Sequence, residues 1–420
     1  MTGETPSMKL IQKIHGKPAW RMRMGALFIC CFSLLAWEGC AHMGKKASHG
    51  PEEALKKVSR FRYPRFSDDM PYIGLIHSID MSLSYLRRVD PGKTFSFGQD
   101  KYAAPHMILS LETFKRFIEG HPGEKELNDF IKKNFFIYQS TANKGRGMLF
   151  TGYYEPSLQG SLVRSGLYRF PIYEPPPDMM MIDLSPFSTD LKGKKITGRI
   201  DNNRLVPYFE RKEIEDPAIF QERATPIAWV RDQTGLFFLQ IQGSGIITLP
   251  DGDHIRVHYH SSNGRPYRSI GKVLIDQGKI DRKEMSMQRI RAYLDLHPEE
   301  REQIFNTNPS YVFFKREEGG PYGCLNVQLT PGRSAATDRR LFPGAALMFV
   351  ESTKPFLDGN GKIQSWKPFS RFFLNQDTGG AIKGAGRCDL FFGNDSYAEV
   401  AAGHMKQEGA MYFLVLKPSR

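Results

Sequence analysis

Two stretches with helix-like spacing of apolar residues bracket a middle part that is patterned like strands. Apolar side chains recur at helical spacing from Leu109 to Phe136, with a break at Pro122-Gly123, and again from Met285 to Phe305. From Ile227 the sequence between them alternates short apolar runs with turn residues, and Phe237–Gln242 is predicted to be one of these strands. A chain of this length has room for two or three domains, and the bracketing favours a β-rich domain inserted into another domain.

The composition is that of an ordinary globular protein. Hydrophobic residues make up 40% of the chain and charged residues 25%, which excludes a disordered or collagen-like chain. The 39 glycines and 27 prolines favour many turns and a mainly β fold with some α. The formal net charge of +13 favours an anionic partner. The basic residues are scattered and not interleaved with aromatic residues, so a nucleic-acid partner is not expected.

The N-terminal region has the order of an export signal. Basic residues precede an apolar stretch of eleven residues, Gly25 to Leu35, which is too short to span a membrane but has the length of a signal peptide. Gly39-Cys40 follows, which predicts a lipoprotein signal peptide over 1–39 with Cys40 as the acylated residue. A polar tether over 40–54 would then precede the folded part.

An ordinary signal peptide is the alternative at this end. Trp37-Glu38 lies where lipoprotein signals prefer leucine and a small residue, and cleavage after Ala41 would also fit. Both alternatives place the protein outside the cytoplasm. Removal of residues 1–39, with five basic and two acidic residues, lowers the net charge to +10. Cys324 and Cys388 would then be the internal thiols of a protein in an oxidising compartment, where disulfides can form. The sequence leaves open whether a disulfide joins these two residues.

Three aspartates, Asp377, Asp389 and Asp395, fall within nineteen residues of a glycine-rich segment. Glycines at 379, 380, 384, 386 and 393 let the backbone turn sharply and approach a ligand closely. Asp389 precedes Leu390-Phe391-Phe392, so its carboxyl group is expected at the start of an apolar strand. Apolar surroundings raise the pKa of a carboxyl group, as a general acid requires. The alternative is that aspartates in such turns cap backbone amides.

Two further motifs are candidates for chemical sites. His254, His258 and His260 would share one face of a strand and, with Asp253, could bind a metal; a solvated strand face is the simpler interpretation. Gly243-Ser244-Gly245 is not a nucleophile elbow, because Gln242 stands where that motif needs glycine. A serine hydrolase triad is therefore not supported.

Five longer motifs occur in order along the chain. They are Phe150-Thr-Gly-Tyr-Tyr-Glu-Pro, Phe238-Leu-Gln-Ile-Gln-Gly-Ser-Gly, Asn263-Gly-Arg-Pro-Tyr-Arg-Ser-Ile-Gly, Ser310-Tyr-Val-Phe-Phe and Asp377-Thr-Gly-Gly-Ala-Ile-Lys-Gly. Through these motifs, the chain resembles the membrane-bound lytic murein transglycosylase A (MltA) family from about residue 65 to 417, and its last part resembles that family's three-aspartate (3D) domain.

The resemblance implies a fold and a division into domains. The main domain would be a double-psi β-barrel with extra helices, formed by residues 55–155 and 280–420. A second β domain, residues 156–279, would be inserted after the Thr-Gly-Tyr-Tyr motif, with a glycan-binding groove between the two. This division agrees with the bracketing pattern described above.

The resemblance also implies an activity. Members of the family cleave the β-1,4 bond between N-acetylmuramic acid and N-acetylglucosamine in peptidoglycan and leave a 1,6-anhydro end. Asp389 matches the single catalytic aspartate, which acts first as acid and then as base. Thr151 matches a residue that hydrogen-bonds this carboxyl group, and Asp377 and Asp395 match supporting aspartates. The remaining matches are expected substrate contacts: Tyr153, Tyr154, Gln242, Gly243, Ser244, Gly379 and Gly380.

No metal and no organic cofactor is implied by the resemblance. The expected partners are peptidoglycan glycan strands and the outer membrane, reached through the lipid anchor from the periplasm, with cell-wall synthesis or division proteins as open candidates. A non-catalytic peptidoglycan-binding lipoprotein on the same scaffold and a glycan hydrolase remain as alternatives. The intact Asp389, Thr151 and Gln242 favour the enzyme.

Overall fold

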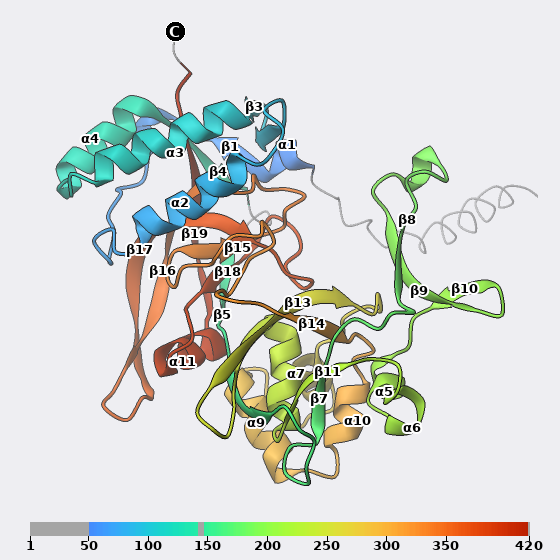
Figure 1. Cartoon of the computed structure of the whole chain (residues 1–420). Coiled ribbons are helices and arrows are strands. Elements are labelled where there is room, and N and C mark those ends of the chain that lie inside the picture. Colours follow the sequence, from blue (N-terminus) through green and yellow to red (C-terminus); the bar gives the residue numbers. More distant parts are fainter. Residues whose placement is uncertain (1–49, 142–146, 419–420) are drawn as a thin grey trace, which may run out of the picture. The chain divides into compact units, whose positions relative to one another are not determined.

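A computed structural model describes residues 50–141 and 147–418 (Figure 1). The predicted signal peptide, Cys40 and most of the predicted tether lie outside the described residues. The last residues of the tether region form a short helix, α1 (Pro51–Ala54), whose Ala54 is buried. No helix within the described ranges combines the length and the apolar character needed to cross a membrane.

A closed barrel of six strands forms the centre of the first body, to which we assign residues 50–155 and 317–418. The strand order is β19-β16-β17-β15-β18-β5, and β5 pairs back onto β19. The pairs β15–β17 and β18–β5 are parallel and the others antiparallel. The strands are β5 (Met148–Tyr153), β15 (Ser334–Ala336), β16 (Leu347–Leu357), β17 (Ile363–Asp377), β18 (Arg387–Phe391) and β19 (Lys406–Leu416).

Helices and short strands, all but α11 from the N-terminal part, pack around this barrel. The predicted helical stretch from Leu109 to Phe136 is confirmed as two helices, α3 and α4, separated at Pro122-Gly123. Strand β4 extends the barrel sheet by pairing with β19, and β1 pairs with β4. The elements are β1 (Leu55–Lys57), η1 (Arg60–Arg62), α2 (Leu75–Leu86), β2 (Thr94–Phe97), β3 (Asp100–Ala103), α3 (Ala104–Ile118), α4 (Glu124–Asn134), β4 (Phe135–Ser140) and α11 (Ser396–His404).

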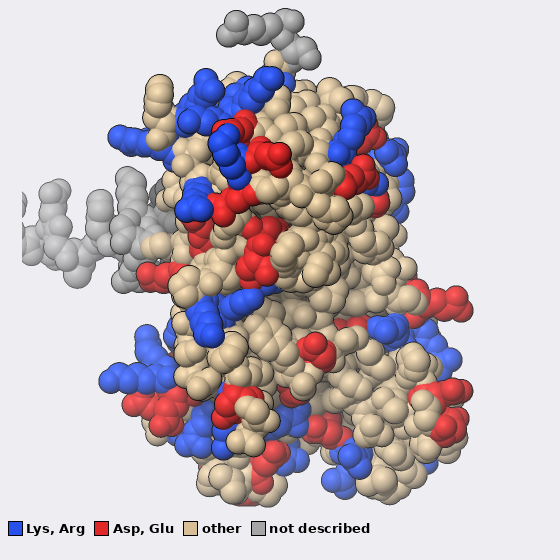
Figure 2. Space-filling view, turned by 90° about the vertical axis from the view of Figure 1, so that its left-hand side faces the viewer, with Lys and Arg blue, Asp and Glu red and all other residues tan. Residues whose placement is uncertain are grey.

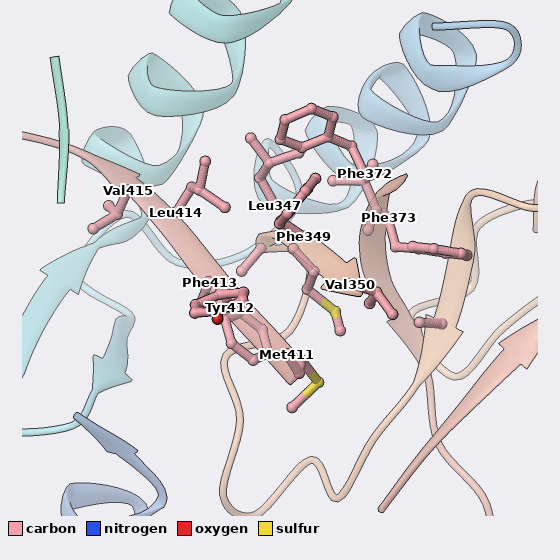
Figure 3. Close-up of a cluster of buried hydrophobic side chains, with 14 of the residues drawn as sticks. Leu347, Phe349, Val350, Phe372, Phe373, Met411, Tyr412, Phe413, Leu414 and Val415 are labelled. Carbon is pink, nitrogen blue, oxygen red and sulfur yellow. The ribbon is translucent and has the colours of Figure 1, made fainter. Parts of the chain in front are cut away.

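Aromatic side chains fill the space between the barrel and the helices (Figure 3). The ring centroids of Phe349 and Phe372, from adjacent strands, lie 5.0 Å apart, and Phe114 of α3 lies 5.1 Å from Phe372. Strands β16, β17 and β19 carry continuous apolar runs here because both of their faces are covered. The observed fold class, mainly β with some α around a closed barrel, is the predicted one.

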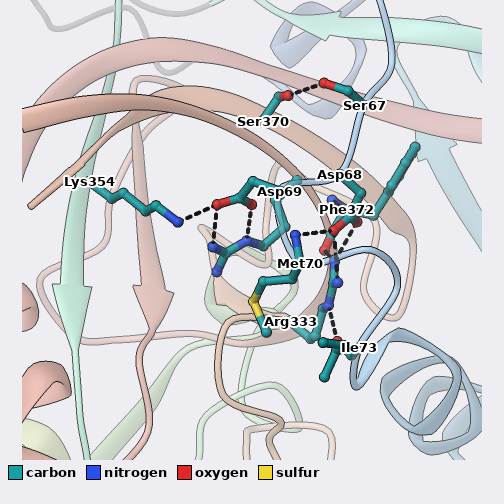
Figure 4. A network of polar contacts seen from close by, with 10 residues as sticks. Ser67, Asp68, Asp69, Met70, Ile73, Arg333, Lys354, Ser370 and Phe372 are labelled. Carbon is teal, nitrogen blue, oxygen red and sulfur yellow. Dashed lines mark hydrogen bonds and ion pairs between the residues drawn. The ribbon is translucent and has the colours of Figure 1, made fainter. Parts of the chain in front are cut away.

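A buried ion pair joins the segment before α2 to the barrel (Figure 4). Arg333 and Asp68 have side chains that are 0% and 2% exposed, and they form two hydrogen bonds of 2.6 and 2.9 Å. The guanidinium group of Arg333 also donates to the carbonyl oxygens of Ile73 and Phe372. These four hydrogen bonds hold the chain that leads into α2 against β15 and β17.

The second body contains the elements from β6 to β14. Its main sheet has the order β14-β13-β12-β6-β11-β7, and a separate sheet has the order β10-β9-β8. The strands are β6 (Ser157–Ser161), β7 (Phe170–Tyr173), β8 (Met180–Asp183), β9 (Lys195–Asp201), β10 (Arg204–Pro207), β11 (Pro226–Val230), β12 (Ser244–Thr248), β13 (His254–Ser262) and β14 (Val312–Arg316). The helices are η2 (Thr189–Leu191), α5 (Arg211–Ile214), α6 (Pro217–Phe220), α7 (Gln233–Gln242), α8 (Ile270–Asp276), α9 (Met287–Leu296) and α10 (Arg301–Asn306).

The predicted strand over Phe237–Gln242 is wrong, because these residues belong to helix α7. Every residue from Thr234 to Gln240 is buried, so the segment shows no apolar–polar period that would distinguish a helix from a buried strand. Asp232 is the N-cap residue that marks the start of this helix, and its side chain accepts a hydrogen bond of 2.9 Å from the backbone N–H of Gly235. Gly243 ends the helix with a φ of 84°.

The predicted helical stretch from Met285 to Phe305 is confirmed as α9 and α10, interrupted around Pro298. Both helices pack with Phe237 and Phe238 of α7 in one hydrophobic cluster, and β14 pairs with β13. These contacts assign residues 280–316 to the second body. We therefore propose that the return to the barrel, expected at 280 from the sequence, lies close to residue 316.

Closure of the barrel depends on a close approach at Gly409. Here β19 leaves β16 and pairs with β5, and a Cβ at Gly409 would lie 2.0 Å from the carbonyl oxygen of Glu351. Backbone atoms cannot yield as the end of a side chain can. We expect Gly409→Ala to lower the free energy of unfolding by about 1–3 kcal/mol or more.

Chemical denaturation of the purified variant measures this loss. Gly359→Ala is the matched control, because a Cβ at Gly359 meets no atom within 4 Å. Equal stability of the two variants would show that strand β19 can shift at no cost, contrary to the tight closure.

Candidate active site

Asp389 and Thr151 lie directly opposite each other on the parallel strands β18 and β5. The hydroxyl group of Thr151 donates a hydrogen bond to Oδ1 of Asp389. The Asp389 side chain is 13% exposed, so it is accessible but mostly enclosed. Asp389 was expected at the start of its strand; it is instead the central residue of β18, because pairing with β5 already begins at Arg387.

The carboxyl group of Asp389 has a charged neighbour, Arg387, which was not among the predicted site residues. Nε of Arg387 donates to Oδ1 at 3.0 Å, and Nη2 approaches Oδ2 at 3.3 Å. Nη2 also lies 3.3 Å from Oγ1 of Thr151. The expected apolar surroundings are therefore incomplete, since a guanidinium group lies against the carboxylate. The sequence did contain a sign of this contact, because Arg387 and Asp389 are two residues apart and such side chains face the same side of a strand.

Asp377 ends strand β17 and connects it to the segment around residue 324. Its Oδ1 accepts hydrogen bonds from the backbone N–H groups of Cys324 and Thr378, at 2.9 and 2.8 Å. Burial raises the pKa of Asp377 to about 6, and the nearby Asp389 acts in the same direction, while the two N–H groups oppose it. Burial and the neighbouring Asp377 also raise the pKa of Tyr153 well above its ordinary value.

Asp395 has a different position from the other two aspartates. It is the N-cap of α11, and its Oδ1 accepts a hydrogen bond of 2.7 Å from the backbone N–H of Ala398. The capping alternative therefore describes Asp395 and, in part, Asp377. Asp389 differs, since its donors in the described part of the chain are the side chains of Thr151 and Arg387.

One hydrogen bond links the end of β5 to the expected sugar-contacting loop of the second body. The backbone N–H of Tyr154 donates to Oε1 of Gln242 at 3.2 Å. Gly243 follows in the left-handed conformation, and Ser244 begins β12 with its side chain nearly buried. The structure thus places Gln242, Gly243 and Ser244 beside the strand that carries Thr151.

The other expected contact residues lie at the end of β5 and in the turn after β17. Tyr153 ends β5, and its ring centroid is 5.2 Å from that of Phe391 on β18. Gly379 and Gly380 form the turn after Asp377, in which the Gly379 carbonyl accepts a hydrogen bond of 3.0 Å from the N–H of Ile382. Gly380 is exposed, with open space where a Cβ would lie.

The three histidines of β13 do not form a metal site in the described part of the chain. His254 and His260 are exposed, and His258 is partly buried, which lowers its pKa. Over residues 50–141 and 147–418, the only group that brings three candidate ligand atoms within 4.8 Å of one another is His297, Glu299 and Glu300.

The two internal cysteines are free thiols. Cys388 is buried in the barrel core and Cys324 is exposed, so the disulfide left open by the sequence is not formed. The basic residues are dispersed as expected: on the face shown in Figure 2, lysine and arginine side chains alternate with aspartate and glutamate.

Comparison with known proteins places the chain in a family. Residues 149–315 match the MltA specific insert domain and residues 333–415 match the 3D domain. The chain is 34% identical over 272 residues to the membrane-bound lytic murein transglycosylase A of Escherichia coli, a match that covers 64% of this chain and 66% of that protein. It is 30% identical over 298 residues to the homolog from Buchnera aphidicola, covering 70% of this chain and 72% of that protein.

Solved structures agree with this assignment. A membrane-bound lytic murein transglycosylase from Agrobacterium tumefaciens superimposes with a TM-score of 0.71 at 30% identity, covering 86% of this chain and 98% of that one. Escherichia coli MltA with bound chitohexaose gives a TM-score of 0.67 at 25% identity, covering 87% and 96%. The fold thus resembles that of these solved structures, and residues 149–315 correspond to the family's insert domain. The chain belongs to the MltA family with a C-terminal 3D domain.

The raised pKa of Asp377 predicts a pH dependence of stability. Between pH 4 and 6 the folded protein holds a proton on Asp377 that the unfolded chain has lost, so the free energy of unfolding falls as the pH rises through this window. Asp377→Asn keeps an oxygen for both N–H donors but cannot titrate. We expect the melting temperature of the wild type to fall relative to that of Asp377→Asn from pH 4 to 6.

Asp377→Ala distinguishes the effect of the hydrogen bonds from the effect of the titrating charge. This variant leaves the N–H groups of Cys324 and Thr378 without their acceptor, so it should lose about 1–3 kcal/mol of stability at every pH. Parallel melting curves of wild type and Asp377→Asn across this pH range would contradict the assignment of a raised pKa to Asp377.

Proposed function

We propose that this protein is a peptidoglycan lytic transglycosylase, which cleaves the β-1,4 bond between N-acetylmuramic acid and N-acetylglucosamine and leaves a 1,6-anhydromuramoyl end. Family membership supports this proposal, as does the chitohexaose bound to the Escherichia coli relative. The observation that carries it is the pairing of Asp389 with Thr151 on adjacent barrel strands, with the carboxyl group partly enclosed.

A single carboxyl group is sufficient for this reaction. Ordinary glycosidases use two, one as acid and the other as base or nucleophile. In the proposed reaction the C6 hydroxyl of the muramic acid attacks C1 of the same sugar, an intramolecular step with high effective molarity. Asp389 gives its proton to the glycosidic oxygen as the bond from C1 to that oxygen breaks. The bond from O6 to C1 forms, and the O6 proton returns to Asp389.

The neighbours of Asp389 have distinct tasks in this mechanism. Thr151 holds the carboxyl group in one orientation through its hydroxyl group. Arg387 would stabilise the carboxylate that exists between the two proton transfers, because its guanidinium group contacts both carboxyl oxygens. Asp377 would fix the turn that contains Gly379 and Gly380 by binding two backbone N–H groups. Asp395 would support the site by capping α11.

The sugar contacts would come from both bodies. Tyr153 and Tyr154 continue the strand of Thr151, and Gln242, Gly243 and Ser244 lie beside them through the hydrogen bond between Tyr154 and Gln242. A glycan strand bound over Asp389 would then lie between the barrel and the loop after α7.

We further propose that the protein acts in the periplasm, anchored to the outer membrane through a lipid on Cys40. The order of basic residues, apolar stretch and Gly39-Cys40 supports this location. The names of the Escherichia coli and Buchnera relatives, which include the words membrane-bound, agree with it.

The central prediction concerns Asp389→Asn. Asparagine keeps the shape of the side chain but cannot deliver a proton, and both proton transfers depend on this one group. General acid–base catalysis contributes about 10²–10⁴-fold, so we expect formation of 1,6-anhydromuropeptides from sacculi to fall by at least that factor. Chromatography of the digestion products measures the loss.

Binding to sacculi should survive in Asp389→Asn. Asp358→Asn is the matched control, because Asp358 lies in the turn between β16 and β17 and binds only backbone N–H groups in the described chain. A folded Asp389→Asn protein that forms anhydro products at a near-normal rate would overturn the catalytic assignment. Products with reducing ends would indicate a hydrolase, and binding without any product from the wild type would indicate a non-catalytic wall-binding protein.

Thr151→Val tests the positioning role of the hydroxyl group. Valine keeps the branched shape at the strand position but removes the donor to Asp389. A hydrogen bond to a charged group contributes about 1.5–3 kcal/mol, so kcat should fall about 10- to 100-fold with little change in KM. Thr151→Ser keeps the hydroxyl group and should recover most of the activity. Similar losses in the serine and valine variants would instead indicate a packing role for Thr151.

A further inference from the structure

A pocket of about 860 Å³ lies between α9, the end of α11, and the first residues of β17 and β19. Its walls thus come from both bodies, since α9 belongs to the second body and the other elements to the barrel body. Six of the lining residues carry the inference: Arg282, Lys283, Gln288, Arg289, Trp366 and Lys406.

The pocket begins beside the strand that carries Thr151. Lys406 of β19 lies directly opposite Thr151 of β5, and Thr151 lies directly opposite Asp389 of β18. Directly opposite residues of paired strands project from the same face of a sheet. Asp389, Thr151 and Lys406 therefore form a row across three strands, with the acid at one end and the wall of the pocket at the other.

The charge of the pocket differs from that of the surface elsewhere. Four cationic side chains line it, and the lining includes one carboxylate, Glu284, whose Oε2 lies 3.4 Å from Nε of Arg289. Many basic side chains elsewhere form ion pairs. Within the described ranges, by contrast, no ion pair is made by Arg282, Lys283 or Lys406, so three cations remain for an anionic ligand.

The pocket also offers a hydrogen-bond acceptor and an apolar surface. The amide nitrogen of Gln288 donates to the carbonyl of Glu399 at 3.0 Å, while its Oε1 is buried and has no partner in the described part of the chain. Such an oxygen is costly to leave unpaired and would accept an N–H from a ligand. Trp366 adds an aromatic surface. Unpaired cations, a free acceptor and an aromatic wall together fit an acidic peptide better than a neutral sugar.

We propose that this pocket binds the peptide stem of the muramic acid next to the bond that is cleaved. The inference rests on the proposed function, since the stem is attached to the sugar that would lie over Asp389. The stem supplies what the pocket lacks: carboxylates for Arg282, Lys283 and Lys406, and amide N–H groups for Gln288. The pocket thereby distinguishes peptide-bearing strands from bare glycan.

The test is calorimetric binding of two matched ligands to the full-length protein carrying Asp389→Asn, which should bind them without cleaving them. One ligand is a peptidoglycan tetrasaccharide with its peptide stems, and the other is the same tetrasaccharide after an amidase has removed them. We expect the stem-bearing ligand to bind about tenfold more tightly, with an advantage that shrinks as salt is raised, because exposed ion pairs are weak individually and screened by salt. Equal affinities would overturn the proposal.

The variant Arg282→Ala/Lys283→Ala/Lys406→Ala should lose most of this advantage. Lys272→Ala is the matched control, because Lys272 is an exposed lysine of α8 outside the pocket. The single exchange Lys406→Gln, on an exposed side chain, provides a second variant, with its melting temperature measured alongside. A triple variant that retains the full preference for stems would refute the assignment.

Activity gives a second readout that separates this proposal from the proposed function. The ratio of anhydro-product formation from stem-bearing and stem-free glycan should fall in the triple variant relative to wild type and Lys272→Ala. If the wild type forms no anhydro product from either glycan, the proposed function fails, while the calorimetric preference still decides whether the pocket binds stems.

Discussion

The ion pair between Asp68 and Arg333 fixes the position of the strands on which the candidate site depends. A buried ion pair adds little net stability compared with apolar packing, because both charges must leave water. Its value here is positional, since the guanidinium group also bonds the carbonyls of Ile73 and Phe372 and so joins three segments. Arg333 directly precedes β15, and Ala336 of β15 lies opposite Asp389. The strand that carries the candidate acid is therefore held from one side by this anchored segment and from the other by β5.

The three aspartates show how one residue type takes different roles within one short segment. Asp395 caps a helix, Asp377 binds two backbone N–H groups, and Asp389 contacts a hydroxyl and a guanidinium group. Their local sequences look alike, with glycines close by. What separates them is the partner that tertiary structure brings to each carboxyl group. In the proposed mechanism, this partner decides whether the carboxyl group is structural or available for proton transfer.

Much of the fold could be predicted because its signals are local. Helices α3 and α4 follow from apolar spacing and the break at Pro122-Gly123. The bracketing of strand-like sequence by helical stretches favoured an inserted body, but the second of these stretches, α9 and α10, packs within that body and does not mark its end. Helix α7 was missed because its buried surroundings remove the polar residues that would reveal its period. The contact of Arg387 with Asp389 could also have been predicted, because residues two apart in a strand share a face. The row from Asp389 to Lys406 and the closure at Gly409 depend on long-range pairing, which local sequence does not specify.

The insertion of the second body also determines when the site can form during folding. Thr151 and Asp389 are neighbours in space but are separated by 238 residues of chain. The sheet of the second body, from β6 to β14, lies entirely within that separation and can assemble from its own strands. Contacts between distant parts of a chain form slowly, because a long loop must first be closed. The barrel thus closes around its last strand, β19, only after nearly the whole chain is present. In a partly folded or truncated chain, Asp389 and Thr151 are not yet paired. Such a delay would prevent the proposed cleavage of peptidoglycan until folding is complete.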